Sequence, residues 1–444
     1  MPTALATDLY QLTMMAGYHA SGQTEPRTFE LFVRGLPEHR NYLVAAGLEQ
    51  ALAYLGALRF TADEIDWLRR LPALADVPRT FFDDYLPAFR FTGEVWALEE
   101  GEVFFAHEPI LRVTAPAAEA QLVETALLGI ITFQTSVASK ASRVVAAAGG
   151  RTVIEFGSRR AHGPDAAVHA ARAAYIAGCA ATSNVEAGRR YGIAVSGTMA
   201  HSWVMGFADE IDAFRQYMAI FGGHSTLLID TYDTVAAARR IVASGLRPSA
   251  VRLDSGDLLA LAREVRRIFD EGGLGATRIL VSGDLDETRI ATLIAAGAPI
   301  DGFGVGTAIS AVSDAPALGG VYKLVETMEG ASARPTMKLS AGKRTFPGRK
   351  QVWRVTDAGI ATHDVIGLDG EAAQDGRPLL VRAMRKGARV LPPVPIDEMQ
   401  ARTLQRVAQL PAALRALEPG PPYPVRISAA LDALARSALR QAAT

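Results

Sequence analysis

The sequence contains a single cysteine, Cys179. One cysteine cannot form an intrachain disulfide or a cysteine-rich zinc cluster, so a disulfide scaffold and a zinc site of the cysteine-rich type are both excluded. Cys179 stands among small apolar residues, which favours a place in the core over a role as nucleophile. No zinc is expected as a cofactor.

Long apolar segments and an excess of charge of either sign are also missing. The longest apolar run, residues 126–133, is too short to span a membrane, and residues 1–8 lack the basic and apolar regions of a signal peptide. The net charge is -1 and the pI is near 6.7, so no basic field for nucleic acid is expected. These absences predict a cytoplasmic protein with no membrane or nucleic-acid partner.

The chain does have enough apolar residues for a large core. It is 49% hydrophobic over 444 residues, a length that favours two or three domains. Early elements are expected as a helix over 3–20 capped by Thr7 or Asp8, a strand over 27–34, helices over 41–70 and β-structure over 90–113. We interpret the β-structure as a mostly antiparallel sheet domain, followed by a helical region over 119–148.

A regular alternation of strands and helices begins after residue 150. Strands are predicted over 152–156, 177–182, 193–196, 226–230, 250–253, 278–281 and 302–305. Helices are predicted between most of them, over 164–176, 184–191, 207–220, 233–244, 257–271 and 286–297. This order predicts a parallel sheet, either a barrel or an open doubly wound sheet. After residue 325 the alternation stops, and β-structure over 352–395 and a last helix over 425–442 are expected.

Polar side chains follow several of these strands, and the loops after the strands form the active face of a parallel barrel. The segment 195–203 delivers Thr198 and His201 after a short apolar run. A histidine there can act as base, ligand or nucleophile, although an isolated histidine is more often packed or capping. After the first strand, Phe156 can stack on a flat ring and Arg159 can bind a carboxylate or phosphate.

The strand over 250–253 ends in two opposite charges, Arg252 and Asp254, on one face. Such charges are costly unless they are paired or used, so a structural salt bridge and a ligand site both remain open. In the ligand reading Arg252 holds an acid and Asp254 contacts a sugar hydroxyl or Mg²⁺. Asp257 is expected to cap the next helix.

Glycine turns follow the last two strands. Their backbone N–H groups can cradle a phosphate, and barrel enzymes commonly bind phosphate at this late-strand position. The residues concerned are Gly283 and Asp284 in the first turn and Gly304, Gly306 and Thr307 in the second. Together with the charged strand they predict a pocket for a phosphorylated sugar and a planar acid.

These residues resemble the nicotinate phosphoribosyltransferase family over nearly the whole chain. The resemblance is carried by the segments Thr7-Asp8-Leu9-Tyr10-Gln11-Leu12-Thr13-Met14, Glu155-Phe156-Gly157-Ser158-Arg159-Arg160, Thr182-Ser183-Asn184, Gly197-Thr198-Met199-Ala200-His201-Ser202, Arg252-Leu253-Asp254-Ser255-Gly256-Asp257 and Gly304-Val305-Gly306-Thr307. It implies a type II phosphoribosyltransferase fold, an irregular parallel α/β barrel with an α+β sandwich domain built from both chain ends. The corresponding divisions are 1–118, 119–326 and 327–444.

The resemblance also implies an activity and site roles. The reaction joins nicotinate to 5-phosphoribosyl 1-pyrophosphate (PRPP), gives nicotinate mononucleotide and pyrophosphate, uses Mg²⁺ and is coupled to ATP hydrolysis. His201 matches the phosphorylated histidine, Phe156 and a neighbouring subunit's Tyr10 match the residues that sandwich the ring, and Asp254 is a candidate Mg²⁺ ligand. Thr198 and Arg252 match nicotinate contacts, and Thr307 and the glycine turns match the phosphate site. Relatives that use the amide usually have an aspartate on the second barrel strand, where this chain has Thr182-Ser183-Asn184; this favours the acid, and Ser183 is a candidate substrate contact. The resemblance also implies a homodimer with shared active sites. The alternative to the enzymatic function is a non-catalytic barrel that binds a phosphosugar.

Overall fold

The computed structural model describes residues 3–330, 332–338, 345–371 and 375–442. The chain forms two compact units, one made of residues 1–136 and 317–444 and the other of residues 137–316. The first unit is therefore assembled from both chain ends, while the second is one continuous segment. Within the part of the chain that is described, no helix is long and apolar enough to cross a membrane.

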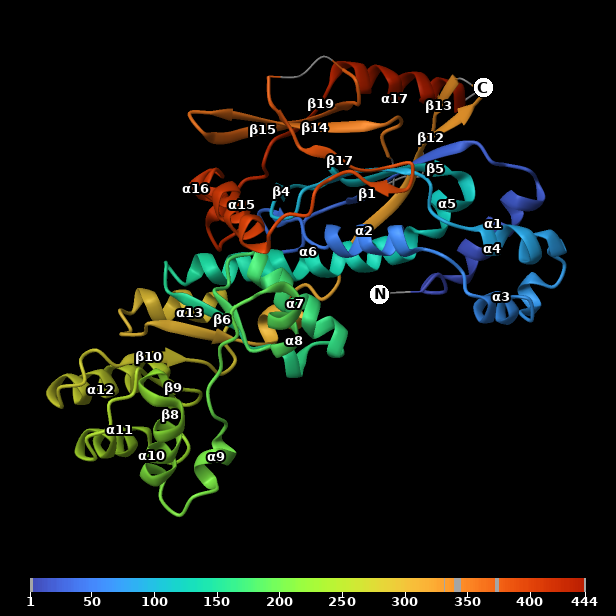
Figure 1. The fold of residues 1–444 in the computed structure, drawn as a ribbon. Coiled ribbons are helices and arrows are strands. Elements are labelled where there is room, and N and C mark those ends of the chain that lie inside the picture. Colours follow the sequence, from blue (N-terminus) through green and yellow to red (C-terminus); the bar gives the residue numbers. More distant parts are fainter. Residues whose placement is uncertain (1–2, 331, 339–344, 372–374, 443–444) are drawn as a thin grey trace. The chain divides into compact units, whose positions relative to one another are not determined.

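The first unit is built on a seven-stranded antiparallel sheet (Figure 1). Its strands, in spatial order, are β13 (Ser332–Pro335), β12 (Gly320–Glu329), β1 (Pro26–Val33), β5 (Pro109–Pro116), β3 (Glu94–Leu98), β17 (Leu380–Arg385) and β18 (Ala388–Arg389). Strands β1 and β12 pair in register from Arg27 with Thr327 to Val33 with Gly320. Across this pair Phe29 and Tyr322 stack with ring centroids 4.8 Å apart, so the sheet joins the two chain ends through its core.

Two smaller sheets complete this unit. The four-stranded sheet contains β16 (Arg377–Pro378), β14 (Lys350–Asp357), β15 (Ile360–Leu368) and β19 (Val425–Ile427), and the two-stranded sheet contains β2 (Leu43–Val44) and β4 (Val103–Phe104). The helices are α1 (Leu9–Ala20), α2 (Leu48–Ala57), α3 (Ala62–Leu68), α4 (Leu86–Ala88), α5 (Ala117–Leu122), α15 (Ile396–Ala408), α16 (Ala412–Arg415) and α17 (Ala429–Ala442). Helix α6 (Glu124–Ala147) continues from this unit into the second.

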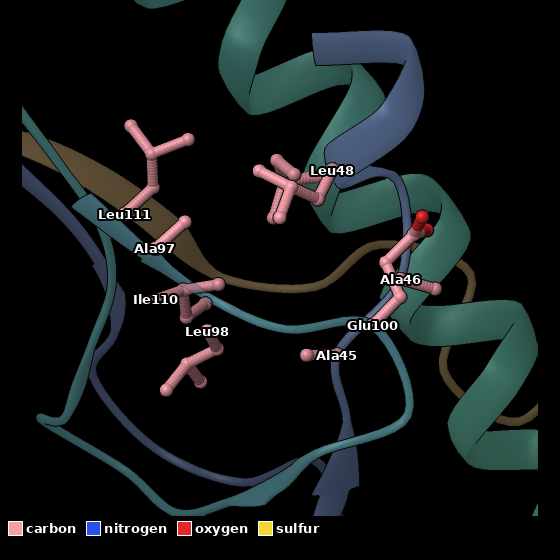
Figure 2. Close-up of a pocket in the computed structure, with 9 residues that line it drawn as sticks. Ala45, Ala46, Leu48, Ala97, Leu98, Glu100, Ile110 and Leu111 are labelled. Atoms are coloured by element: carbon pink, nitrogen blue, oxygen red, sulfur yellow. The ribbon is translucent and has the colours of Figure 1, made fainter. Parts of the chain in front are cut away.

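A small, mostly apolar pocket lies inside the first unit. Figure 2 shows aliphatic side chains of β3, β5 and the segment 45–48 around it, with Glu100 at its edge. The Glu100 carboxylate accepts hydrogen bonds from the backbone N–H groups of Gly47 (2.6 Å) and Glu49 (3.3 Å). Glu100 therefore satisfies backbone donors at the start of α2, which explains a carboxylate beside an apolar space.

Within the first unit, the segment 416–424 is held in place by hydrogen bonds to side chains that are distant in the sequence. Asn41 donates to the carbonyl oxygens of Ala416 (3.1 Å) and Glu418 (3.0 Å) and accepts from the N–H of Gly420 (2.9 Å). The Tyr423 hydroxyl donates to the buried carboxylate of Asp364 (3.0 Å). The segment 416–424 thus has hydrogen-bonded partners although it lacks regular secondary structure.

The second unit carries a six-stranded parallel sheet in the order β7, β6, β11, β10, β9, β8. The strands are β6 (Thr152–Glu155), β7 (Ala181–Thr182), β8 (Thr226–Leu228), β9 (Ala250–Leu253), β10 (Arg278–Val281) and β11 (Gly302–Val305). The first strand of the series, β6, pairs with the last, β11. Sequential order with this closing pair is the arrangement of a barrel and not of a doubly wound sheet, so the predicted irregular α/β barrel is confirmed.

Seven helices of the described part of this unit lie between these strands, and an eighth, α14, follows the last strand. They are α7 (Pro164–Ile176), α8 (Val185–Tyr191), α9 (His201–Met205), α10 (Glu210–Phe221), α11 (Thr234–Ala243), α12 (Leu258–Glu271), α13 (Glu287–Ala295) and α14 (Thr307–Ala311). The six predicted helices of the alternation correspond to α7, α8, α10, α11, α12 and α13. Asp257 accepts hydrogen bonds from the N–H groups of Leu259 and Ala260, both at 3.1 Å, which confirms its predicted capping role.

Several predicted elements were wrong in type or extent. The strand expected over 193–196 is reduced to a single bridge between Thr182 and Val195, and Val195 is 52% exposed; its backbone bonds to β7 on one side only, and no pairing among the described residues joins it to β8. The strand expected over 177–182 is shortened because α7 ends at Ala177 and Gly178 turns with a φ of +113°. The barrel is therefore irregular on this side.

Two terminal helices also begin later than predicted. Helix α1 begins at Leu9, with Asp8 at the N-cap position, but the Asp8 carboxylate accepts from the Thr125 hydroxyl (2.8 Å) and not from the helix backbone. In the last helix, residues 425–427 form β19 beside β15, and α17 starts only at Ala429. The predicted cysteine environment is confirmed, since Cys179 is fully buried.

Candidate active site

A cavity inside the parallel sheet is lined by residues of β6, β8, β9, β10 and β11 and of the loops that contain Phe156, Ser196 and Thr198. Among its lining residues are four of the predicted site residues, Phe156, Thr198, Arg252 and Gly304. The remaining wall is largely apolar and is made by Ile154, Ser196, Thr226, Leu280, Val281 and Phe303. A mostly apolar cavity with one guanidinium and a few hydroxyls suits a planar ring that carries one negative group.

Arg252 is the charged group of this cavity. Its Nη1 donates to Asp254 Oδ1 and to Ser282 Oγ, both at 3.0 Å, and its Nη2 donates to the carbonyl oxygen of Met199 at 3.2 Å. Its Nε–H is buried and has no hydrogen-bond partner among the described residues. Burial lowers the pKa of Arg252, Asp254 and Asp230 oppose that shift, and Arg159 adds to it. An unpaired donor on a buried cation favours an anionic ligand.

Asp254 lies between Arg252 and His201. Its Oδ1 accepts from Arg252 and from the Ser282 hydroxyl, and its Oδ2 is 3.9 Å from His201 Nε2. His201 begins α9, its side chain is 40% exposed, and its Nδ1 lies 3.1 Å from Thr231 Oγ1. The imidazole is therefore oriented by a hydroxyl on one nitrogen and faces a carboxylate with the other.

Two glycines are required by close backbone approaches in this region. A Cβ on Gly304 would lie 2.5 Å from the Phe156 ring, and a Cβ on Gly283 would lie 2.1 Å from the carbonyl oxygen of Asp254. Gly283 also has a φ of +91°, which side-chain-bearing residues rarely adopt. Asp284, which follows it, is exposed with a φ of +46°, so this turn presents backbone to the strand-end face.

The other predicted residues lie outside the cavity. Arg159 is exposed and lines a separate open pocket with Ser158 and Asn184. Ser183 follows β7, and its N–H donates to the Glu155 carbonyl oxygen (2.9 Å). Gly306 and Thr307 stand at the start of α14, where Thr307 is exposed.

Tyr10 belongs to the first unit, where it lies on α1 and is 49% exposed. Its predicted place over the ring of a neighbouring subunit stays a prediction.

Sequence reasoning missed Asp230 and Thr231, which follow β8. Asp230 Oδ2 accepts from the Asp254 N–H (3.0 Å) and the Ser255 hydroxyl (2.6 Å), while its Oδ1 is buried without a hydrogen-bond partner in the described structure. The usable signal was the same as for Arg252 and Asp254, namely polar residues directly after a short apolar strand. Ser282 was also missed, because a serine at a strand end has no distinctive pattern.

A divalent cation can be accommodated by part of this arrangement. No group of three or more His, Cys, Asp or Glu side chains with metal-ligating geometry occurs in the described segments. Magnesium, however, is often held by one or two carboxylates while phosphate and water supply the other ligands. The oxygens that fit are Asp254 Oδ2 and the unpartnered Asp230 Oδ1.

Comparisons with known proteins agree with this geometry. The nicotinate phosphoribosyltransferase (NAPRTase) N-terminal domain matches residues 5–132, and the nicotinate phosphoribosyltransferase (NAPRTase) family matches residues 152–324. A nicotinate phosphoribosyltransferase of Mycobacterium tuberculosis is 45% identical over 433 residues, which cover 96% of this chain and 91% of that protein. The Bacillus subtilis nicotinate phosphoribosyltransferase is 43% identical over 391 residues, covering 85% and 78%.

A solved structure shows the same fold. The crystal structure of human nicotinic acid phosphoribosyltransferase aligns with a TM-score of 0.85 at 29% identity, covering 97% of this chain and 99% of that one. The two family matches together span more than half of the chain, and the bacterial relatives exceed 40% identity over most of it. The chain belongs to the nicotinate phosphoribosyltransferase family.

Proposed function

We propose that this protein transfers the phosphoribosyl group of PRPP to nicotinate, giving nicotinate mononucleotide and pyrophosphate as a step of NAD synthesis. The observation that supports this most directly is the cavity lined by Phe156, Thr198, Arg252 and Gly304. It offers an aromatic face for a pyridine ring and a buried cation with a free donor for its carboxylate. The names of the relatives point to the same substrate.

In this reaction the pyridine nitrogen attacks C1 of the ribose, and the bond from C1 to the pyrophosphate oxygen breaks. The ring nitrogen is already nucleophilic and carries no proton near neutral pH, so no general base is needed. The residues act by positioning: Phe156 orients the ring, Arg252 and Thr198 hold the carboxylate, and Asp254 takes a ribose hydroxyl or the cation. Asp254 and Asp230 would hold Mg²⁺, which would supply positive charge for the departing pyrophosphate.

The direct test is a product assay with nicotinate, nicotinamide and quinolinate in parallel, each with PRPP and Mg²⁺. We expect product from nicotinate, because Arg252 supplies a charge partner that the uncharged amide cannot use and the single cavity cation leaves a second carboxylate unpaired. Tight binding of a phosphorylated sugar without turnover of any of the three substrates would instead support a non-catalytic binding barrel.

We further infer that ATP hydrolysis is coupled to the transfer through His201. A nitrogen of the imidazole attacks the γ-phosphorus of ATP, and the bond to ADP breaks. His201 is partly exposed at the strand-end face and oriented by Thr231. The added phosphoryl group carries about two negative charges, which attract Mg²⁺ and favour a different arrangement of the loops beside Asp254.

This coupling predicts a phosphate on His201 that is labile to acid and stable to base. His201→Ala is expected to lose ATP hydrolysis and ATP stimulation while it retains slow transfer without ATP. His224→Ala, which removes another exposed histidine of the same unit, serves as the matched control and should behave as the parent protein. Undiminished ATP stimulation in His201→Ala, or phosphate on no histidine, would exclude the coupling.

A further inference from the structure

Glu155 is a buried carboxylate with no cationic partner among the described residues. It is the last residue of β6, is 1% exposed, and uses both oxygens on neutral donors. Its Oε1 accepts from the N–H of Gly157, and its Oε2 accepts from the Thr182 hydroxyl at 2.6 Å. Burial raises the pKa of Glu155, and these two hydrogen bonds oppose the shift. A buried acid is costly, so its placement calls for a reason beyond packing.

The hydrogen bonds continue from Thr182 back to the loop that follows β6. Thr182 Oγ1 accepts from the N–H of Asn184 at 3.0 Å. The Asn184 side chain donates from Nδ2 to Ser158 Oγ (3.0 Å) and accepts at Oδ1 from the N–H of Ala187 (2.9 Å), which caps α8. The chain of bonds therefore runs from the end of β6 to the end of β7 and returns to Ser158.

Two candidate substrate contacts lie inside this circuit. Phe156 is flanked by Glu155 and Gly157, and its N–H donates to the Val305 carbonyl oxygen (2.8 Å). Ser183 is flanked by Thr182 and Asn184, and its N–H donates to the Glu155 carbonyl oxygen. Because the residues on both sides of each contact are hydrogen-bonded, the circuit limits how far the Phe156 ring and the Ser183 backbone can move relative to each other.

We propose that Glu155, Thr182, Asn184 and Ser158 form a brace that positions Phe156 and Ser183 for the pyridine ring. This inference rests on the proposed function and names positioning residues, not catalytic ones. The brace consists entirely of hydrogen bonds between strand ends, so it can be weakened without removing any group that touches the substrate. Loss of the Thr182 hydroxyl breaks it at its centre, since that hydroxyl both donates to Glu155 and accepts from Asn184.

The test compares three threonine substitutions in steady-state assays. Thr182→Val removes the hydroxyl at nearly constant shape and is expected to raise the nicotinate KM about tenfold, with the KM for PRPP and kcat changed less than about twofold. Thr182→Ser restores the hydroxyl and should return the nicotinate KM to near the parent value. Thr277→Val is the matched control. Thr277 is also buried and also donates one hydrogen bond, to the Pro248 carbonyl oxygen (3.0 Å). It lies directly before the first residue of β10 and not after the end of a strand.

The outcomes separate the brace from general stability and from the proposed function. If both valine variants lower the melting temperature but only Thr182→Val raises the nicotinate KM, the brace is supported. An unchanged nicotinate KM in Thr182→Val, or an equal rise in Thr277→Val, overturns it. If Thr182→Val does not fold, Ser158→Ala at the partly exposed end replaces it, with a two- to threefold rise expected and no rise overturning the brace. A parent protein that gives no product from nicotinate refutes the proposed function itself, and the brace falls with it.

Discussion

Arg252 combines the two roles that sequence reasoning had left open. Its ion pair with Asp254 at 3.0 Å agrees with a structural role, and its buried Nε–H, which has no hydrogen-bond partner in the described segments, favours a role in ligand binding. The paired Asp254 reduces the cost of burying the guanidinium, while the free donor is left for an acid. An arginine at the end of a strand can therefore be structural and substrate-binding at once.

Removal of this side chain should act mainly on nicotinate binding. Loss of a buried charge-assisted pair costs about 2–5 kcal/mol, so Arg252→Ala is expected to raise the nicotinate KM at least about 30-fold. Arg278→Ala, at the exposed first residue of β10 in the same unit, is the control and should leave the KM unchanged. Steady-state kinetics of both variants decide the matter, and near-normal nicotinate affinity in Arg252→Ala would contradict the assignment.

The aspartates in the loops that precede the helices of the second unit have two different roles, helix capping and contact with a neighbouring strand. The sequence alone does not distinguish these roles. Asp209, Asp233, Asp257 and Asp286 accept hydrogen bonds from the first turns of α10, α11, α12 and α13. Asp254, three residues before Asp257, caps nothing and instead contacts Arg252 and Ser282. The difference depends on whether a carboxylate reaches the N–H groups of the next helix or points toward the neighbouring strand.

Substitution of the capping residue should therefore affect stability and not substrate binding. Asp257→Ala is expected to lower the free energy of unfolding by about 1 kcal/mol, because two backbone donors of α12 lose their acceptor. Asp257→Ser retains an acceptor and should recover most of that loss. Urea denaturation gives the stability and nicotinate kinetics give the KM; a large KM change in Asp257→Ala would show that this residue does more than cap.

Local sequence patterns were sufficient to predict most helices of the second unit but not all of its strands. Helices α7, α8 and α10–α13 were predicted as the segments between successive strands, and side chains of Asn184, Asp209, Asp233, Asp257 and Asp286 cap all of them except α7. The strand over 193–196 was wrong because an apolar run carries no information about whether partners exist on both sides. Val195 has one neighbouring strand and remains half exposed.

For the molecule as a whole, the candidate site residues are divided between the two compact units. Tyr10 lies in the first unit, and Arg252 and Phe156 lie in the second. The family resemblance predicts a dimer in which Tyr10 of one subunit covers the ring bound by the other. The exposed ring of Tyr10 provides the apolar and polar surface that such a contact needs.

Shared sites make a specific prediction for mixed dimers. Tyr10→Ala and Arg252→Ala subunits should each be poorly active alone, yet a hybrid dimer should regain activity because one of its two sites then has both residues intact. The measurement is nicotinate mononucleotide formation by hybrids purified through two different affinity tags. Verified hybrids that remain as inactive as the parents would remove the shared-site prediction.

The sequence alone determined the alternating strand and helix order, the exclusion of an intrachain disulfide, and the strand-end positions of Phe156, Arg252 and Asp254. These features are local, since periodicity, caps and strand ends are encoded within about ten residues of each other. Only the tertiary structure decided that β1 pairs with β12 across nearly 300 residues, that β6 closes on β11, and that Asp230 accepts from the Asp254 N–H and Glu155 from the Thr182 hydroxyl. These depend on which distant segments meet, and the burial that leaves Arg252 Nε and Asp230 Oδ1 without partners exists only after the strands have been brought together.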